Sequence, residues 1–275
     1  VYGIYSGTRS MNSRDTLIRY VARAPLQLAL IRAKEAELFS KIPLTRPVLD
    51  IGCADGIFAE VAFGKKGTID VGIDIDDVAL GIAREKKIYR RVVRADARNL
   101  PFRDAQFGSV ISNQSMEHIK GVDAVFAEVA RVLKKRGTFV FLVPTIYLAD
   151  YWLTSAAFRL IGLTRMGDFF HTLRNRIFHH ENLWPASVWK RKLEAHGLTI
   201  DTLRYNGTKK NYFVSELLWP LRIPQLLLTR LLGSEVLFPR GPAVFAAKVL
   251  SKFLSTDGTA IPASGATMLI TAHKT

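Results

Sequence analysis

Residues 48–62 read VLDIGCADGIFAEVA, and this stretch decides the fold class. An apolar, strand-like run leads into a turn with Gly52 and Gly56 and then into helix-forming residues. Glycines let the backbone turn sharply and lie close to a ligand. In open parallel sheets such turns lie at the carboxyl ends of strands, where ligands bind. Taken alone, the segment fits a nucleotide-like ligand site and a purely structural turn equally well.

Short apolar runs alternate with amphipathic ones around this segment. Besides residues 48–51, six runs are expected to be strands, at 70–74, 91–96, 109–113, 138–143, 198–205 and 266–273. Such alternation indicates a parallel sheet covered by helices. The predicted fold is α/β: a Rossmann-like, seven-stranded, mostly parallel sheet with helices on both faces and helical insertions after strands 5 and 6.

Helical periodicity is visible in three segments, at residues 25–41, 122–133 and 185–197. The second has a continuous apolar stripe and is followed by three basic residues, so Gly137 is expected to form its left-handed cap.

We divide the chain into an N-terminal helical lead-in, residues 1–45, and a main domain, residues 46–275. The main domain contains insertions at about 145–183 and 207–263. Both insertions are longer than simple connections, and loops of that length usually carry function.

The composition describes a chain of 275 residues with 48% hydrophobic content and a net charge of +15. That charge favours anionic partners without choosing among them. Cys53 is the single cysteine, which fits a reducing compartment. The sequence shows no secretory signal and no apolar run long enough to span a bilayer, so we expect a cytoplasmic protein.

A second signal for a ligand is Asp74, which ends the second strand about 20 residues after the turn. A carboxylate at that place can accept hydrogen bonds from both ribose hydroxyls, or it can cap the following helix together with Asp76 and Asp77. A nicotinamide cofactor is disfavoured because Phe58 and Ala59 stand where the third glycine of its motif would fall.

Four motifs in order resemble the class I S-adenosylmethionine-dependent methyltransferases, in particular the ubiquinone/menaquinone-biosynthesis group. They are LDIGCADG, GIDID, RADARNLPFRDAQFGSVISNQSMEHI and FAEVARVLKKRGTFVFLVP. The resemblance covers residues 46–143 closely and returns at 184–205 and 265–274. It implies that S-adenosyl-L-methionine is the cofactor and that the chain is a methyltransferase.

The same resemblance implies a cofactor site. The loop after the first strand would lie beneath the methionine part, Asp74 would bind the ribose, Asp96 and Ala97 would face the adenine, and Asn113 would lie near the sulfonium. The full expected set is Asp50, Gly52, Cys53, Gly56, Asp74, Ile75, Asp96, Ala97 and Asn113. Ala54 departs from the pattern by replacing the usual middle glycine, so a slightly altered loop is expected.

A hydroxyl or phenol acceptor would need a general base. The candidates are His118, His171, His179, His180 and Glu181. His118, in the family's Glu-His pair, could instead shape the pocket, and the trio at 179–181 could be a solvated loop end. The ligand spacing does not support a metal site, so none is predicted.

The insertions bear on the acceptor and on partners. Both are rich in large apolar residues, and the second carries an excess of Lys and Arg. We predict a small, lipophilic or lipid-linked acceptor and leave open peripheral contact with an anionic membrane, a lid over a soluble substrate, and an oligomer interface. The alternatives are a tRNA- or RNA-modifying methyltransferase, disfavoured because no RNA-binding module is visible, and a non-catalytic binding protein.

Overall fold

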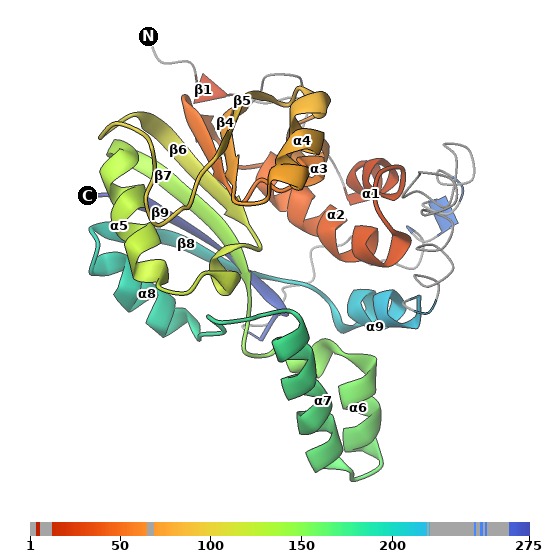
Figure 1. Cartoon of the computed structure of the whole chain (residues 1–275). Coiled ribbons are helices and arrows are strands. Elements are labelled where there is room, and N and C mark those ends of the chain that lie inside the picture. Colours follow the sequence, from red (N-terminus) through yellow and green to blue (C-terminus); the bar gives the residue numbers. More distant parts are fainter. Residues whose placement is uncertain are drawn as a thin grey trace.

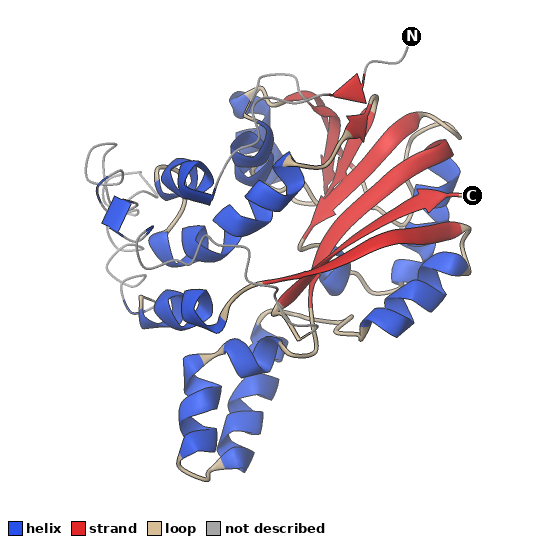
Figure 2. Cartoon of the chain, turned by 180° about the vertical axis from the view of Figure 1, so that it is seen from behind, coloured by secondary structure: helices blue, strands red, loops and turns tan. Residues whose placement is uncertain are grey.

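The computed structural model describes residues 4–5, 13–64, 69–218 and 264–275, with single positions at 220, 245, 248, 249 and 251. Its centre is a seven-stranded sheet with helices on both faces (Figures 1 and 2). Across the sheet the strands are β5 (Tyr89–Arg94), β4 (Ile69–Asp74), β3 (Val48–Ile51), β6 (Phe107–Asn113), β7 (Leu133–Pro144), β9 (Thr267–Lys274) and β8 (Leu198–Asn206). β9 alone runs opposite to the other six strands, so the sheet is mostly parallel and the predicted fold class is confirmed.

The strands are apolar because the sheet is covered on both sides. In β7, Phe139 and Phe141 pack into the core on one face, while Val140 and Leu142 pack into the core on the other. This alternation follows the two-residue period of a strand.

Two groups of helices form these cores. On one face lie α1 (Ser13–Val21), α2 (Leu26–Ser40), α3 (Ile57–Phe63) and α4 (Asp77–Lys86); on the other lie α5 (Val122–Val132) and α8 (Ala186–Glu194). Figure 1 shows the two groups on opposite sides of the strands.

The N-terminal segment is part of this architecture. Pro25 precedes α2, and apolar residues of α1 and α2 such as Leu17 and Leu30 belong to the same core cluster as Val48 of the central strand. A two-residue strand, β1 (Ile4–Tyr5), pairs with β2 (Leu44–Thr45) in a small separate sheet. The sequence did not predict this pair, since two residues show no periodicity.

The expected cap of the second predicted helix is wrong. Helix α5 ends at Val132, and Leu133 already begins an extended strand. The left-handed residue nearby is Arg136, with φ of 59°, and not Gly137. A Cβ at Gly137 would lie 2.8 Å from the carbonyl oxygen of Lys134, so this glycine permits a close backbone approach.

The two insertions follow β7 and β8. The first contains the short helix η2 (Leu148–Tyr151) and two longer helices, α6 (Leu153–Leu160) and α7 (Thr164–Ile177), which project from the body as a hairpin (Figures 1 and 2). The second begins with α9 (Lys209–Leu217), and most of the remainder, with its predicted basic and apolar surface, lies outside the described residues. Among the described helices, none combines the length and apolar character needed to cross a bilayer.

Candidate cofactor and acceptor site

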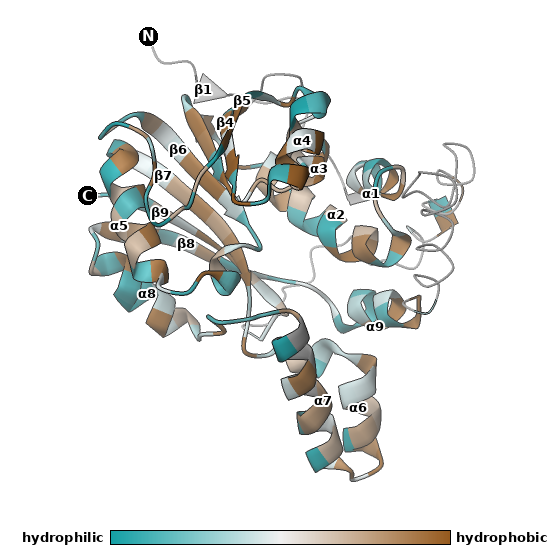
Figure 3. Ribbon diagram, viewed as in Figure 1, coloured by the Kyte–Doolittle hydropathy of each residue, from teal (hydrophilic) through white to brown (hydrophobic). Residues whose placement is uncertain are grey.

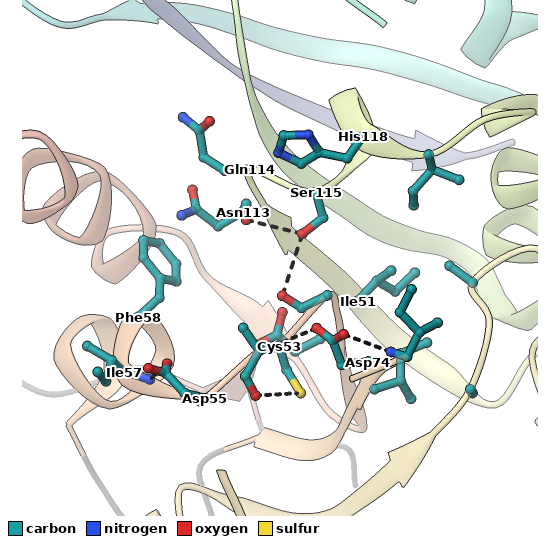
Figure 4. Close-up of a pocket in the computed structure, with 18 of the residues that line it drawn as sticks. Ile51, Cys53, Asp55, Ile57, Phe58, Asp74, Asn113, Gln114, Ser115 and His118 are labelled. Carbon is teal, nitrogen blue, oxygen red and sulfur yellow. Dashed lines mark hydrogen bonds between the residues drawn. The ribbon is translucent and has the colours of Figure 1, made fainter. Parts of the chain in front are cut away.

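A cavity lies where the chain order of the strands reverses. From β3 the chain continues outward through β4 and β5 and then returns to place β6 on the other side of β3. Ligands bind at such switch points in open α/β sheets. A cavity of about 700 Å³ occurs there, within the usual range for small-molecule sites. Figure 4 shows that it is lined by the loops that follow these strands.

The loop after β3 is held tightly against β4. The backbone N–H groups of Gly52 and Cys53 both donate to the carbonyl of Ile73, at 2.9 Å each. Gly52 has φ of +73°, and a Cβ on it would lie 2.1 Å from the Oγ of Ser115. Glycine is therefore required at position 52 both by backbone conformation and by space. Two residues after Gly52, Ala54 adopts φ of 44°, a left-handed conformation that glycine adopts more readily.

Asp74 organises this loop from the end of β4. Its carboxylate accepts backbone hydrogen bonds from Ala54 at 2.9 Å, Ile75 at 2.7 Å and Asp76 at 3.1 Å. A carboxylate has about four lone-pair positions, so about one stays available for a ligand hydroxyl. The alternative capping role belongs to Asp76, whose side chain accepts from the N–H groups of Val78 and Ala79 at the start of α4.

Asp50 and Cys53 line the cavity and are buried. Asp50 accepts a 2.7 Å hydrogen bond from the hydroxyl of Tyr89, and burial raises the pKa of Asp50 to about 7. Burial also raises the pKa of the Cys53 thiol. Gly56, which was expected in the cofactor set, does not line the cavity. It forms the left-handed N-cap of α3, where a Cβ would lie 3.1 Å from the Tyr89 ring.

The expected adenine side of the cavity contains Ile75, Asp96 and Ala97. Ile75 is 67% exposed, so its apolar side chain offers an uncovered surface at the cavity edge. Asp96 forms an exposed ion pair with Arg98, with Nη2 and Oδ2 2.6 Å apart, and these hydrogen bonds lower the pKa of Asp96. An exposed pair of this kind contributes little stability, so a ligand can displace it at small cost.

A polar cluster that sequence reasoning missed lies between α2 and the end of β6. Glu35 is fully buried and pairs with Arg32 at 2.9 Å. The side-chain amides of Asn113 and Gln114 donate to Glu35 at 3.2 and 3.0 Å. Arg32, Asn113 and Gln114 line the cavity, so α2 contributes to the site. The sequence gives little signal for this cluster, because Glu35 is one of several charged residues of α2, beside Arg32, Lys34 and Glu37.

His118 lies at the cavity wall, in the short helix η1 (Met116–His118). Its Nδ1 lies 3.1 Å from the carbonyl oxygen of His179, and burial lowers the pKa of His118. Beside it, Glu117 is fully buried, its Oε1 is 3.6 Å from His118 Nε2, and burial raises the pKa of Glu117 to about 8. Neither oxygen of Glu117 has a hydrogen bond to a described residue. Sequence reasoning did not single out Glu117.

Three of the other base candidates, His179, His180 and Glu181, lie near His118 but do not line the cavity. The ring centroids of His118 and His180 are 5.3 Å apart, and the carbonyl oxygen of His179 lies 3.1 Å from Nδ1 of His118. Glu181 donates its backbone N–H to the carbonyl of Glu117 at 2.8 Å, while its carboxylate is 3.5 Å from Lys120. The side chain of His171 lies outside the described part of the structure. Among the described side chains, no group of three or more His, Cys, Asp or Glu could hold a metal ion.

Comparison with known proteins identifies the region that carries this cavity. Residues 49–141 match the methyltransferase domain family. They include the loop after β3, the ends of β4 and β6, and His118. The chain therefore carries a class I S-adenosylmethionine-dependent methyltransferase domain.

Individual relatives match this methyltransferase domain over part of their length. The malonyl-[acyl-carrier protein] O-methyltransferase of Legionella pneumophila is 34% identical over 100 residues, which are 35% of each chain. The ubiquinone biosynthesis O-methyltransferase of Sinorhizobium medicae is 30% identical over 125 residues, 41% of this chain and 49% of that one. The chain thus matches no more than half the length of either relative. Among solved structures, the [4+2]-cyclase SpnF superposes with a TM-score of 0.54 at 20% identity, over 92% of this chain and 83% of that one, which shows likeness of fold.

The residues of the methyltransferase domain fit S-adenosylmethionine, its cofactor. Asp74 retains acceptor capacity for a ribose hydroxyl, Ile75 offers an apolar surface, and the Oδ1 of Asn113 is buried without a hydrogen-bond partner among the described residues. A buried amide oxygen without a partner is costly unless a ligand supplies a donor or favourable charge. These features lie around one cavity, so a single ligand can satisfy all of them.

Proposed function

We propose that this protein transfers a methyl group from S-adenosylmethionine to a nucleophilic atom of a small lipophilic acceptor. The observation that carries the proposal is that eight of the nine expected cofactor residues and His118 line one cavity. The eight are Asp50, Gly52, Cys53, Asp74, Ile75, Asp96, Ala97 and Asn113. The bound cofactor supplies an electrophilic methyl group on its sulfonium, so the protein mainly has to position the acceptor and exclude water.

The wall contributed by the N-terminal helices supports an apolar acceptor. Tyr20 of α1, Ala24 of the turn that follows it and Leu28 of α2 line the cavity. Leu28 is 41% exposed, so part of this apolar surface is open to a ligand. Two relatives point the same way, since their names describe methylation of an acyl-carrier-linked malonyl group and a step in ubiquinone biosynthesis.

His118 is our candidate for the group that removes a proton from a hydroxyl acceptor. A hydrogen bond from Nδ1 to the carbonyl of His179 assigns the proton to Nδ1 and leaves the lone pair on Nε2. Because burial lowers the pKa of His118, the imidazole is neutral near pH 7 and able to accept a proton. The proton lost by the hydroxyl stays on Nε2, which lies 3.6 Å from Oε1 of Glu117.

Titration calorimetry with S-adenosylmethionine, followed by methyl transfer from labelled cofactor to a lipid extract, tests the proposal. Binding with labelled product in the organic phase is the expected result. Binding without transfer to any acceptor would favour a non-catalytic binding protein, and transfer that is lost after nuclease treatment would favour an RNA substrate. Absence of cofactor binding would overturn the proposal.

The role of His118 has its own test. His118→Gln should lower kcat for a hydroxyl acceptor by roughly a hundredfold or more, while cofactor affinity changes little, as expected for loss of general-base catalysis. The matched control is His273→Gln, because His273 lies on β9 and pairs with Asp201 at 2.7 Å, outside the cavity lining. Equal activity of the two variants would show that His118 does not accept the proton.

A further inference from the structure

The two helices of the α6–α7 hairpin, which we call the arm, pack against each other. The rings of Phe158 and Phe170 stack with centroids 5.2 Å apart. Gly167 of α7 lies against α6, where an added Cβ would lie 3.4 Å from the carbonyl oxygen of Ser155. At the base, the side chain of Thr154 donates to Glu216 of α9 at 2.8 Å. The arm therefore keeps its shape while it projects from the body (Figure 2).

The tip of this arm is apolar and exposed. Leu160 is 88% exposed, Ile161 66% and Leu163 48%, around a turn at Gly162 with φ of +77°. Phe169, one turn further along α7, is 61% exposed. Figure 3 shows apolar positions along both helices of the arm. Single exposed apolar residues are ordinary, but a contiguous group at the end of a projection marks a contact surface.

Basic side chains flank the apolar tip. Arg159 directly precedes Leu160, and Arg165 follows the turn; both are exposed. Arg159 is paired with Asp150 and, at 3.6 Å, with Asp168. Arg165 has no ion-pair partner among the described residues, whereas Arg176 lies at the other end of α7. An apolar tip with an unpaired arginine beside it, in a chain of net charge +15, is complementary to a lipid surface with anionic headgroups.

The arm is connected to the segment that carries His118, which lines the cavity. The residues that follow α7 are tied to the 116–119 segment: the side chain of Asn182 donates to the carbonyls of Met116 at 2.8 Å and Ile119 at 2.7 Å. The carbonyl of His179 meets the ring of His118. Residues 178–182 thus connect the end of α7 to the segment that carries His118.

We propose that the α6–α7 arm docks the protein on an anionic lipid surface by inserting its tip, residues 160–163, among the lipid headgroups. The exposed apolar side chains of the tip can partition into a bilayer surface, with Arg165 at the level of the phosphates. This inference rests on the proposed function in one respect: docking would place the cavity beside a source of lipophilic acceptors.

Sedimentation with vesicles tests the docking. Vesicles of equal parts phosphatidylglycerol and phosphatidylcholine should bind the protein, vesicles of phosphatidylcholine alone should bind it more weakly, and added salt should weaken binding to the anionic vesicles. The double variant Leu160→Ser and Ile161→Ser should reduce binding to anionic vesicles by about tenfold or more, because it removes the apolar side chains that enter the bilayer. The matched control is Val78→Ser, which removes a 78% exposed apolar side chain on α4, away from the arm.

Three results would overturn the proposal: wild-type protein that ignores anionic vesicles, a double variant that binds them as wild type does, or equal loss of binding in Val78→Ser. Light scattering tests whether the tip instead contacts a second copy of the chain. If the double variant converts a dimer to a monomer and leaves vesicle binding unchanged, the tip is a contact between copies. Cofactor binding, measured by calorimetry, does not require the tip. Failure of the proposed function can therefore be distinguished from failure of the docking proposal.

Discussion

Replacing Ala54 by glycine should stabilise the folded protein. Ala54 adopts φ of 44° in the loop after β3, between glycines at 52 and 56 that also have positive φ. An L-residue in the left-handed region costs about 1–2 kcal/mol, which glycine avoids. Glycine in turn gives the unfolded chain extra freedom worth about 0.4–1 kcal/mol. The difference predicts a net increase of about 0.5–1 kcal/mol in the free energy of unfolding for Ala54→Gly.

Urea or guanidinium unfolding measures this difference, and thermal unfolding should show a rise in Tm of about 1–4 °C for a domain of this size. The matched control is Ala127→Gly, in the middle of α5 and on its exposed side. The same chemical change there should lower the free energy of unfolding by about 1 kcal/mol, because glycine is a poor helix former.

The opposite signs of the two variants are the decisive feature. If Ala54→Gly destabilises the protein as much as Ala127→Gly does, then Ala54 does not occupy a left-handed conformation and the described shape of the loop is incorrect. An effect on cofactor affinity alone, with stability unchanged, would also contradict the reasoning, since the strain is present without ligand.

Three further outcomes follow from the same geometry. Gly52→Ala should destabilise the protein and lower S-adenosylmethionine affinity, because the new Cβ would lie 2.1 Å from Ser115 Oγ; thermal unfolding and calorimetry check this. Asp74→Ala should weaken cofactor binding by about tenfold or more, the loss expected when a charged hydrogen-bond acceptor is removed; calorimetry with unchanged affinity would place the ribose elsewhere. Glu117, with a folded-state pKa of about 8 against an ordinary value of 4.5, makes the free energy of unfolding fall as pH rises between these values, since only the unfolded chain releases the proton. Glu117→Gln should flatten that fall by up to about 1.4 kcal/mol per pH unit, and denaturant unfolding at pH 5 to 8 would show no change if Glu117 were ionised in the folded state.

Patterns of burial explain why the sheet could be predicted. Each central strand is covered on both faces, so residues such as those of 138–143 form apolar runs that are visible without a structure. The cap of α5 could not be predicted in the same way. Gly137 suggested a left-handed position, whereas the crowding that requires glycine there comes from a carbonyl oxygen of the same turn, which only coordinates reveal.

The candidate site was predictable where it follows a strand end and unpredictable where it depends on packing. Asp74 and Asn113 lie at the ends of their strands, and their position in the motif predicts their place at the cavity. Glu35 and Arg32 lie about 80 residues before Asn113, on a helix whose polar side could equally have faced solvent. The exact partners of His118 depend on how residues 179–182 return to the body, and sequence spacing does not contain that information.

The position of α1 and α2 has a consequence for how this domain can be modified. Both helices precede residue 49, where the match to the methyltransferase family begins, yet Tyr20, Leu28 and Arg32 form one side of the cavity. The cofactor loop and the wall proposed to contact the acceptor thus come from consecutive stretches of the sequence. Chimeras that exchange residues 13–41 between relatives would change this side of the cavity, whereas trimming the chain to residues 49–141 would remove the helices that complete one of its two cores and the Glu35 carboxylate that holds Asn113.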